Sequence, residues 1–179
     1  AKDLPLCLES LMPGLEDGLI REVIIADGGS ADATARIADA TGAGIVTGAK
    51  GRGAQLAAGA KAARGEWLLF LHADTALSRD WTERVGEHLD KRPGMAAAFT
   101  LKYRSDARAA RWLEARANRR ARWLGLPYGD QGILMKVSDY RRVGGYPDQP
   151  LMEDVALAFA LSKAGKRPAP LPVRALTSA

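Results

Sequence analysis

The sequence predicts an α/β domain with a mostly parallel sheet and helices on both faces. Short apolar runs alternate with longer amphipathic segments, giving strand, helix, strand, helix, strand within the first 75 residues. Five apolar residues in a row, Trp67 to Leu71, are too few for a typical helix and are typical of a strand buried on both faces. Two strands end in an acid, Asp27 and Asp74, at the edge where such sheets bind ligands.

The composition is that of one ordinary globular domain. The 179 residues are 47% hydrophobic and 26% charged. No apolar run approaches the roughly 18 residues that span a bilayer, and no early segment looks like a signal peptide, so we expect a cytoplasmic protein. A single cysteine, Cys7, and two distant histidines, His72 and His88, argue against a Cys/His zinc site, so we expect oxygen ligands for any metal.

The first predicted element is a helix, because Leu4, Leu8 and Leu11 share one face. It leads into a strand over Glu22 to Ala26. A helix that precedes a strand is half of a βαβ unit. We therefore expect that residues 1–179 form a single domain that lacks its first strand.

The next predicted helix begins after Ser30, a good N-cap, and ends at Gly42. A short strand over 45–47 leads to a glycine-rich loop that opens a helix over Ala54 to Arg64. The remaining expected elements are helices over 79–91 and 106–123, strands over 96–103 and 133–137, a helical turn over 138–143, and a final helix from Glu153 to Gly165.

A candidate site lies where the strand ends converge. Lys50 and Arg52 place two cations at a helix N-terminus, which suits an anion, although the spacing matches neither a Walker A loop nor a dinucleotide fingerprint. Gly28 allows close approach of a ligand to the backbone beside Asp27. Taken singly, each motif fits a plain turn or helix cap equally well. Together with Asp74, they suit a nucleotide with a divalent ion.

A third acidic cluster, Glu153 and Asp154, begins the last predicted helix. Interaction with the helix dipole explains one acid there, and the second remains to be explained. The helix N-terminus lowers the pKa of a carboxyl group, so a general base at this position needs burial or a nearby anion.

Six motifs occur in an order that covers nearly the whole chain, and with them the sequence resembles the family 2 glycosyltransferases. This resemblance implies the GT-A fold, with a Rossmann-like, mixed sheet. The motifs are VIIADGGSADAT (23–34), GRGAQ (51–55), GEWLLFLHADT (65–75), GDQG (129–132), GGYP (144–147) and MEDVAL (152–157).

The resemblance implies transfer of a sugar, with inversion, from a nucleoside diphosphate donor that is UDP-linked. Asp27 would then contact the uracil or ribose, Arg52 would lie close to the nucleotide, and Asp74 would hold Mg²⁺ or Mn²⁺ across the diphosphate. Asp154 would be the general base on the acceptor hydroxyl, with Glu153 supporting it. The metal would stabilise charge on the leaving diphosphate.

Two features depart from the family pattern. His72 stands where the family has the first aspartate of a metal-binding triplet, so it either ligates the metal or only packs. From the pattern of the family we expect that residues 1–179 lack the opening strand and also C-terminal elements beyond Pro172. The HAD, GDQG and LMED motifs are similar to a bacterial subgroup associated with arsenosugar biosynthesis.

Two other functions compete with this reading. A sugar-phosphate nucleotidyltransferase would use similar residues on an α/β sheet. Alternatively, seven arginines from Arg104 to Arg122, against Asp106 and Glu114, would suit a non-catalytic module that binds the inner face of a membrane or, less well, nucleic acid. We favour an ordinary amphipathic helix with a solvated basic face, packed through Ala109, Trp112, Leu113, Ala117 and Ala121.

Overall fold

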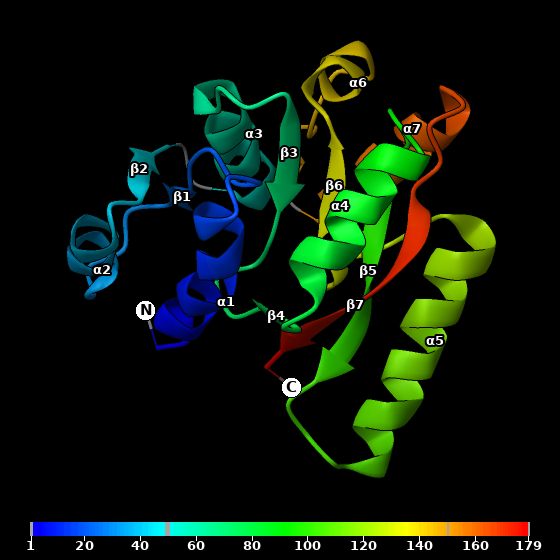
Figure 1. Cartoon of the computed structure of the whole chain (residues 1–179), viewed down its shortest axis with the longest axis horizontal. Coiled ribbons are helices and arrows are strands. Elements are labelled where there is room, and N and C mark those ends of the chain that lie inside the picture. Colours follow the sequence, from blue (N-terminus) through cyan, green and yellow to red (C-terminus); the bar gives the residue numbers. More distant parts are fainter. Residues whose placement is uncertain (1, 49–50, 150, 179) are drawn as a thin grey trace.

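The computed structural model describes residues 2–48, 51–149 and 151–178. The strands are β1 (Ile24–Asp27), β2 (Gly44–Thr47), β3 (Trp67–Phe70), β4 (Ala76–Leu77), β5 (Ala97–Tyr103), β6 (Ile133–Lys136) and β7 (Ala169–Thr177). β1 and β2 form a small parallel sheet, and the other five form a mixed sheet in the order β3, β6, β5, β7, β4. The small sheet lies to one side of the large one (Figure 1).

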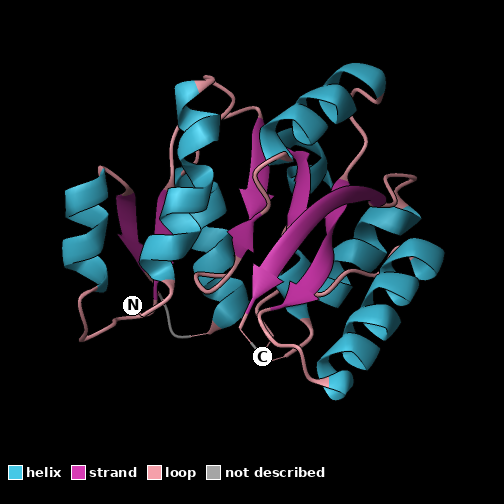
Figure 2. Ribbon diagram, turned by 60° about the horizontal axis from the view of Figure 1, so that its bottom comes forward, coloured by secondary structure: helices cyan, strands magenta, loops and turns pink. Residues whose placement is uncertain are grey.

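Helices lie on both sides of the strands, which confirms the predicted α/β class (Figure 2). They are α1 (Leu4–Glu16), α2 (Thr34–Thr41), α3 (Arg52–Ala62), α4 (Trp81–Lys91), α5 (Arg108–Leu124), α6 (Val137–Arg142), α7 (Glu153–Lys163) and the short 3₁₀ turn η1 (Gly129–Gln131). No helix among the described residues is long and apolar enough to cross a membrane.

The large sheet mixes strand directions. β5 and β7 pair in parallel, whereas β6 is antiparallel to both β3 and β5, and β4 is antiparallel to β7. β3 is less buried than predicted, because Leu68 is buried but Trp67, Leu69 and Phe70 are half-buried. The reason is that β3 pairs with β6 on one side only, while its other edge borders an open cleft.

Two apolar clusters hold the sheet from its opposite faces. One joins α1 and α4 to the strands through residues such as Trp81, Phe99 and Val173. The other joins α3, α6 and α7 through residues such as Met135 and Leu157. These five side chains are at most 2% exposed, so both faces of the large sheet are covered by well-packed apolar cores.

Helix α3 aligns β1 with β3. At its C-terminal end, the backbone N–H and side chain of Arg64 bind the carboxylate of Glu22 at 2.7 and 3.1 Å, just before β1 begins. At its N-terminal end, Gln55 lies against Gly28, just after β1 ends. Both strands therefore run from the C-terminal to the N-terminal end of α3, and their carboxyl ends share one edge, as predicted.

The start of α2 differs from the prediction. Ser30 was expected to cap this helix, but α2 begins at Thr34, and its first N–H binds Asp32 Oδ1 at 3.0 Å. Ser30 turns back instead, and its backbone N–H donates to Asp27 Oδ2 at 2.9 Å. The glycine-rich turn therefore extends further than the sequence suggested, and Asp27 organises it.

The face on which α5 packs also differs from the prediction. Ala117 and Ala121 are buried as expected, but Trp112 is 57% exposed and Leu113 is 48% exposed. Ala109 is exposed as well. The packed face instead consists of Ala110, Glu114, Ala117 and Ala121. The small alanines allow close approach to β5, and Glu114 tolerates burial because it accepts the Tyr103 N–H at 2.8 Å and pairs with Lys102 at 3.3 Å.

Candidate active site

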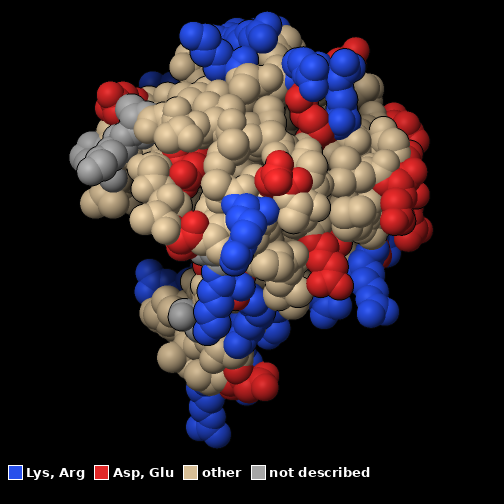
Figure 3. Space-filling model, turned by 90° about the vertical axis from the view of Figure 1, so that its left-hand side faces the viewer, with Lys and Arg blue, Asp and Glu red and all other residues tan. Residues whose placement is uncertain are grey.

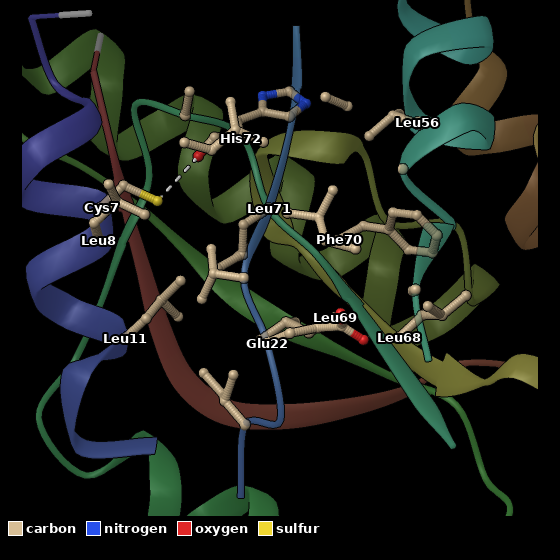
Figure 4. Close-up of a pocket in the computed structure, with 18 of the residues that line it drawn as sticks. Cys7, Leu8, Leu11, Glu22, Leu56, Leu68, Leu69, Phe70, Leu71 and His72 are labelled. Atoms are coloured by element: carbon tan, nitrogen blue, oxygen red, sulfur yellow. Dashed lines mark hydrogen bonds between the residues drawn. The ribbon is translucent and has the colours of Figure 1, made fainter. Parts of the chain in front are cut away.

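A cleft of about 1180 Å³ separates β1 from β3 and opens at their carboxyl ends. Its walls are mostly apolar, with Cys7, Leu8 and Leu11 of α1 on one side and Leu56 of α3 on the other (Figure 4). The Cys7 thiol donates to the His72 carbonyl oxygen at 3.7 Å. Burial and, secondarily, Asp74 raise the pKa of Cys7 to about 11, so this thiol stays protonated at neutral pH.

Asp27 and Gly28 lie at the rim of this cleft. The Asp27 carboxylate accepts the N–H of Gly29 at 3.2 Å and the N–H and hydroxyl of Ser30 at 2.9 and 2.5 Å. These bonds, the Ser30 hydroxyl foremost, lower the pKa of Asp27. A Cβ on Gly28 would stand 2.2 Å from Gln55 Nε2, so the Gln55 side chain packs directly against this glycine. The Asp27 turn is therefore rigid and negatively charged.

Arg52 begins α3 and joins the rim of the cleft to the start of α7. Its Nε lies 3.6 Å from Glu153 Oε1, and Glu153 is 2% exposed. The neighbouring Gly53 packs so closely that a Cβ there would lie 2.4 Å from the Pro147 carbonyl oxygen. Three of the sequence motifs thus meet at one point. Lys50, the other predicted cation, lies outside the described residues.

Asp74 and His72 follow β3. The Asp74 carboxylate accepts bonds from Thr75 at 3.5 Å and from Ser178. Although burial opposes ionisation, the Ser178 hydrogen bond and nearby His72 lower the pKa of Asp74. Burial and then the charge of Arg52 lower the pKa of His72, which favours the neutral imidazole. The lowered pKa favours an ionised Asp74 carboxylate at the rim of the cleft, where it could bind a cation.

Asp154, at the start of α7, faces His72 across Gly129. Its Oδ2 accepts the Gly129 N–H at 3.0 Å. A Cβ on Gly129 would lie 2.4 Å from His72 Nε2 and 2.5 Å from Asp154 Oδ2. Burial, followed by the charge of Glu153, raises the pKa of Asp154. The burial that a base at this position requires is thus present, and it overcomes the opposing effect of the helix N-terminus.

The sequence did not single out Asp130 and Tyr146. The Tyr103 hydroxyl donates to Asp130 Oδ2 at 3.5 Å, while Oδ1 is buried without a hydrogen-bond partner in the described part of the chain. Burial and the nearby Asp154 raise the pKa of Tyr146 well above its usual value. Both residues lie within recognised motifs, GDQG and GGYP, so the motifs were the available signal, but nothing in the local pattern distinguished these two positions.

The residues fit a divalent ion only in part. Within residues 2–48, 51–149 and 151–178, no three His, Cys, Asp or Glu side chains group as a metal site. Asp74 supplies one carboxylate, with the His72 imidazole two residues earlier. Mg²⁺ and similar hard ions are often bound by one or two carboxylates together with substrate phosphates and water. This donor set therefore suits an ion that arrives with a phosphate-bearing ligand.

The fold and these residues define a class: an α/β domain with acidic and basic side chains at the carboxyl ends of its strands. The model of one family, glycosyl transferase family 2, matches residues 1–142. The chain belongs to that family. No curated protein matches it.

Solved glycosyltransferases share the fold. A mannosyltransferase from Pyrobaculum calidifontis, in complex with GDP-Man and Mn²⁺, is 20% identical with a TM-score of 0.69, and the match covers 98% of this chain and 53% of that one. Glucosyl-3-phosphoglycerate synthase from Mycobacterium tuberculosis, with Mn²⁺ and UDP-glucose, is 20% identical with a TM-score of 0.67, covering 99% and 67%. The chain thus spans between about half and two thirds of these proteins.

Proposed function

We propose that this protein transfers a sugar from a nucleoside diphosphate donor, UDP-linked, to an acceptor hydroxyl with inversion. The observation that carries the proposal is the position of Arg52. It pairs with Glu153 beside Asp154, it lies on the cleft rim with Asp27 and Asp74, and its charge acts on both His72 and Asp154. The Arg52 guanidinium group therefore lies between the proposed donor site at the cleft rim and the proposed base, Asp154, at the start of α7.

On the donor side, the cleft rim would bind the nucleotide. Asp27, ionised and held by its turn, would accept hydrogen bonds from the uracil or ribose, with Gly28 allowing close approach. Arg52 would compensate phosphate charge. Asp74 would hold Mg²⁺ or Mn²⁺ against the diphosphate, and the ion would stabilise the charge that develops on the leaving group. The two solved relatives described above carry Mn²⁺ and nucleotide sugars, which supports this assignment.

On the acceptor side, Asp154 would remove the proton. As the acceptor oxygen attacks the anomeric carbon, its proton passes to the Asp154 carboxylate, and the bond to the diphosphate oxygen breaks on the opposite face of the sugar. This geometry inverts the anomeric centre. Glu153, buried and paired with Arg52, would support the position of Asp154 at the start of α7.

The acceptor class and the cellular location are part of the same proposal. The motif pattern favours a hexosyltransferase of the bacterial subgroup associated with arsenosugar biosynthesis. The solved synthase binds a different acceptor, phosphoglyceric acid, in another complex. We place the activity in the cytoplasm, with contact at the inner face of the membrane.

We also propose that a further strand completes the domain between β1 and β3. Hydrogen bonds join β1 to β2 and β3 to β6, while the facing edges border the cleft. Both strands run in the same direction, and α1 precedes β1, as a βαβ unit with a strand in the cleft would require.

Calorimetric titration with UDP, with and without Mn²⁺, tests the function. We expect binding that needs Mn²⁺ and weakens at least tenfold in Asp74→Ala. Asp90→Ala is the matched control, because Asp90 is an exposed acid on α4 and should behave as wild type. Metal-independent binding, or equal effects of both substitutions, would contradict the role of Asp74.

The rival nucleotidyltransferase predicts a different product. That enzyme would release pyrophosphate from UTP and a sugar phosphate, whereas a glycosyltransferase releases UDP from a UDP-sugar. Pyrophosphate release that depends on Asp74 would replace our proposal with the rival.

A further inference from the structure

The outward face of α5 carries a stripe of cations and tryptophans, which we call the α5 surface. Its members recur at helical spacing along one side of the helix, opposite the packed alanines: Arg108, Trp112, Arg116, Arg119 and Trp123. Trp112 is 57% exposed and Trp123 is 70% exposed, and Leu124 beside them is 60% exposed. The Arg116 guanidinium lies over the Trp112 ring, 4.6 Å from its centroid.

The charge of this surface is of one sign. α5 contains six arginines and one acid, Glu114, and that acid is buried toward β5, where it pairs with Lys102. The outward face of α5 therefore carries no carboxylate. Arg120 is engaged elsewhere, because its Nε donates to the Leu126 carbonyl at 2.9 Å and its guanidinium stacks on Tyr128. The remaining five arginines are exposed.

The α5 surface is not used to build the fold. The helix is held through Ala110, Ala117 and Ala121 and through Asn118, whose amide binds both the N–H and the C=O of Leu101 at 2.8 and 3.1 Å. Trp112 and Trp123 contribute no buried contact comparable to these. Their exposure therefore needs a different explanation from stability of the domain.

We infer that the α5 surface binds an anionic lipid surface. Tryptophan prefers the boundary between headgroups and acyl chains, where its ring is half-immersed and its N–H stays hydrated. Arginines around it are attracted to acidic headgroups, and long side chains can reach them from a helix that lies in the plane of the surface. Nucleic acid would use the arginines, but it does not account for Leu124 beside Trp123.

The connection that leads into α5, outside the α5 surface itself, contacts the candidate active site. Arg104, in the connection from β5 to α5, donates to the Asp74 carbonyl at 2.7 Å and pairs with Asp3 at 3.0 Å. In Figure 3, Lys and Arg side chains gather at the narrower lower part of the molecule, the end at which β5 passes into α5 in Figure 1. The connection into α5 thus lies beside Asp74 at the cleft rim, while the outward face of α5 points away from the cleft.

Co-sedimentation with vesicles tests the inference directly on the 179-residue chain. We expect at least tenfold stronger partitioning into phosphatidylcholine vesicles that contain 30 mol% phosphatidylglycerol than into phosphatidylcholine alone. The double variant Trp112→Ser, Trp123→Ser should lose at least tenfold in partitioning. The triple variant Arg108→Gln, Arg116→Gln, Arg119→Gln should lose the preference for anionic vesicles.

Phe159→Ser is the matched control. Phe159 is 52% exposed on α7, and Lys163 lies over its ring at 4.7 Å. It is thus also an exposed aromatic side chain paired with a cation, but on another helix. It should partition as wild type, and tryptophan emission should shift to the blue on vesicle binding in this control.

Several outcomes would overturn the inference. These are equal partitioning into neutral and anionic vesicles, no partitioning at low salt, or a double tryptophan variant that binds like the control. Tighter binding to a DNA duplex than to vesicles would assign the arginines to nucleic acid. Loss of a dimer in the tryptophan variant would assign the surface to self-association. None of these results depends on glycosyl transfer, so the proposed transferase activity stands or falls separately from membrane contact.

Discussion

Asp154, the proposed general base, has a pKa that depends on opposing features of its surroundings. It stands at a helix N-terminus, where its pKa would be lowered, yet burial and Glu153 raise that pKa. Arg52 and the Gly129 N–H oppose the rise. The balance raises its pKa, so this carboxylate is more basic than one in water, as a general base should be.

The raised pKa of Asp154 gives a prediction about pH. A base works only when deprotonated, so turnover with saturating donor and acceptor should fall as pH decreases through this pKa, at a higher pH than for an exposed carboxyl. Asp154→Asn should reduce turnover by about 10²- to 10⁴-fold while UDP binding persists. The measurement is the pH profile of UDP release, with UDP calorimetry as the control. Near-normal turnover of Asp154→Asn would remove it from the mechanism.

Gly129 offers a second prediction at this scale. A Cβ there would lie between His72 and Asp154, at 2.4 and 2.5 Å from their polar atoms, so Gly129→Ala should displace Asp154 and reduce turnover at least tenfold. Gly86→Ala is the matched control, because nothing lies within 4 Å of a Cβ at that position in α4. It should retain activity and gain about 0.5–1 kcal/mol of stability. Equal activities of the two variants would contradict the close approach.

Sequence reasoning at the scale of residues selected candidate site residues but not their contacts. Asp27, Arg52, Asp74 and Asp154 were selected because each follows a strand or begins a helix. Their partners come from far along the chain, as with the contact between Gly129 and Asp154, and no local pattern encodes such a contact.

At the scale of elements, α5 substitutes for a strand. β6 pairs only with Ala97 and Ala98 of β5. Further along β5, the amide of Asn118 binds the N–H and C=O of Leu101, and Glu114 accepts the N–H of Tyr103. Side chains of one helix thus satisfy backbone groups that would otherwise need a neighbouring strand.

Removal of this clamp should destabilise the fold. Asn118→Ala would leave the Leu101 N–H and C=O without their partners, which costs about 1–3 kcal/mol in the free energy of unfolding. Arg119→Ala, on the exposed face of the same helix, should lie within about 0.5 kcal/mol of wild type. Urea denaturation measures both. A difference smaller than the error between the two would show that water replaces the amide at no cost.

Two elements differ from the prediction for separate reasons. β7 escaped prediction because Pro170 and Pro172 interrupt its apolar pattern, yet both prolines fall on the exposed side and the alternate residues are buried. The packed face of α5 was only partly right, because Trp112 and Leu113 were taken as core together with Ala117 and Ala121.

At the scale of the whole molecule, helices join the two sheets, and no strand pairing links them within the described residues. α3 contacts the segments that flank β1 through Arg64 and Gln55, and it packs against the large sheet through Ala60. The family and the α/β class could be predicted because their signals are local and ordered along the chain. The strand order of the large sheet could not, because the pairing of β7 with both β5 and β4 is set by contacts between distant segments.

The open cleft predicts uneven protection of backbone amides. Hydrogen exchange should be faster for β1 and β3, each paired along one edge in the described structure, than for β5, which is paired with β6 and β7 and capped by Asn118. Mass spectrometry of peptic fragments measures this. Protection of β3 equal to that of β5 would show that the facing edges are already paired, and would contradict the proposed additional strand.

The cleft between β1 and β3 also bears on how the protein behaves in concentrated solution. Two parallel strand edges that face each other across apolar walls form a template onto which any extended chain can add, including a segment of another molecule. Aggregation should then begin at this template and respond little to salt, since backbone hydrogen bonds rather than charges would direct it. A short β-forming peptide that occupies the cleft would act as a solubiliser.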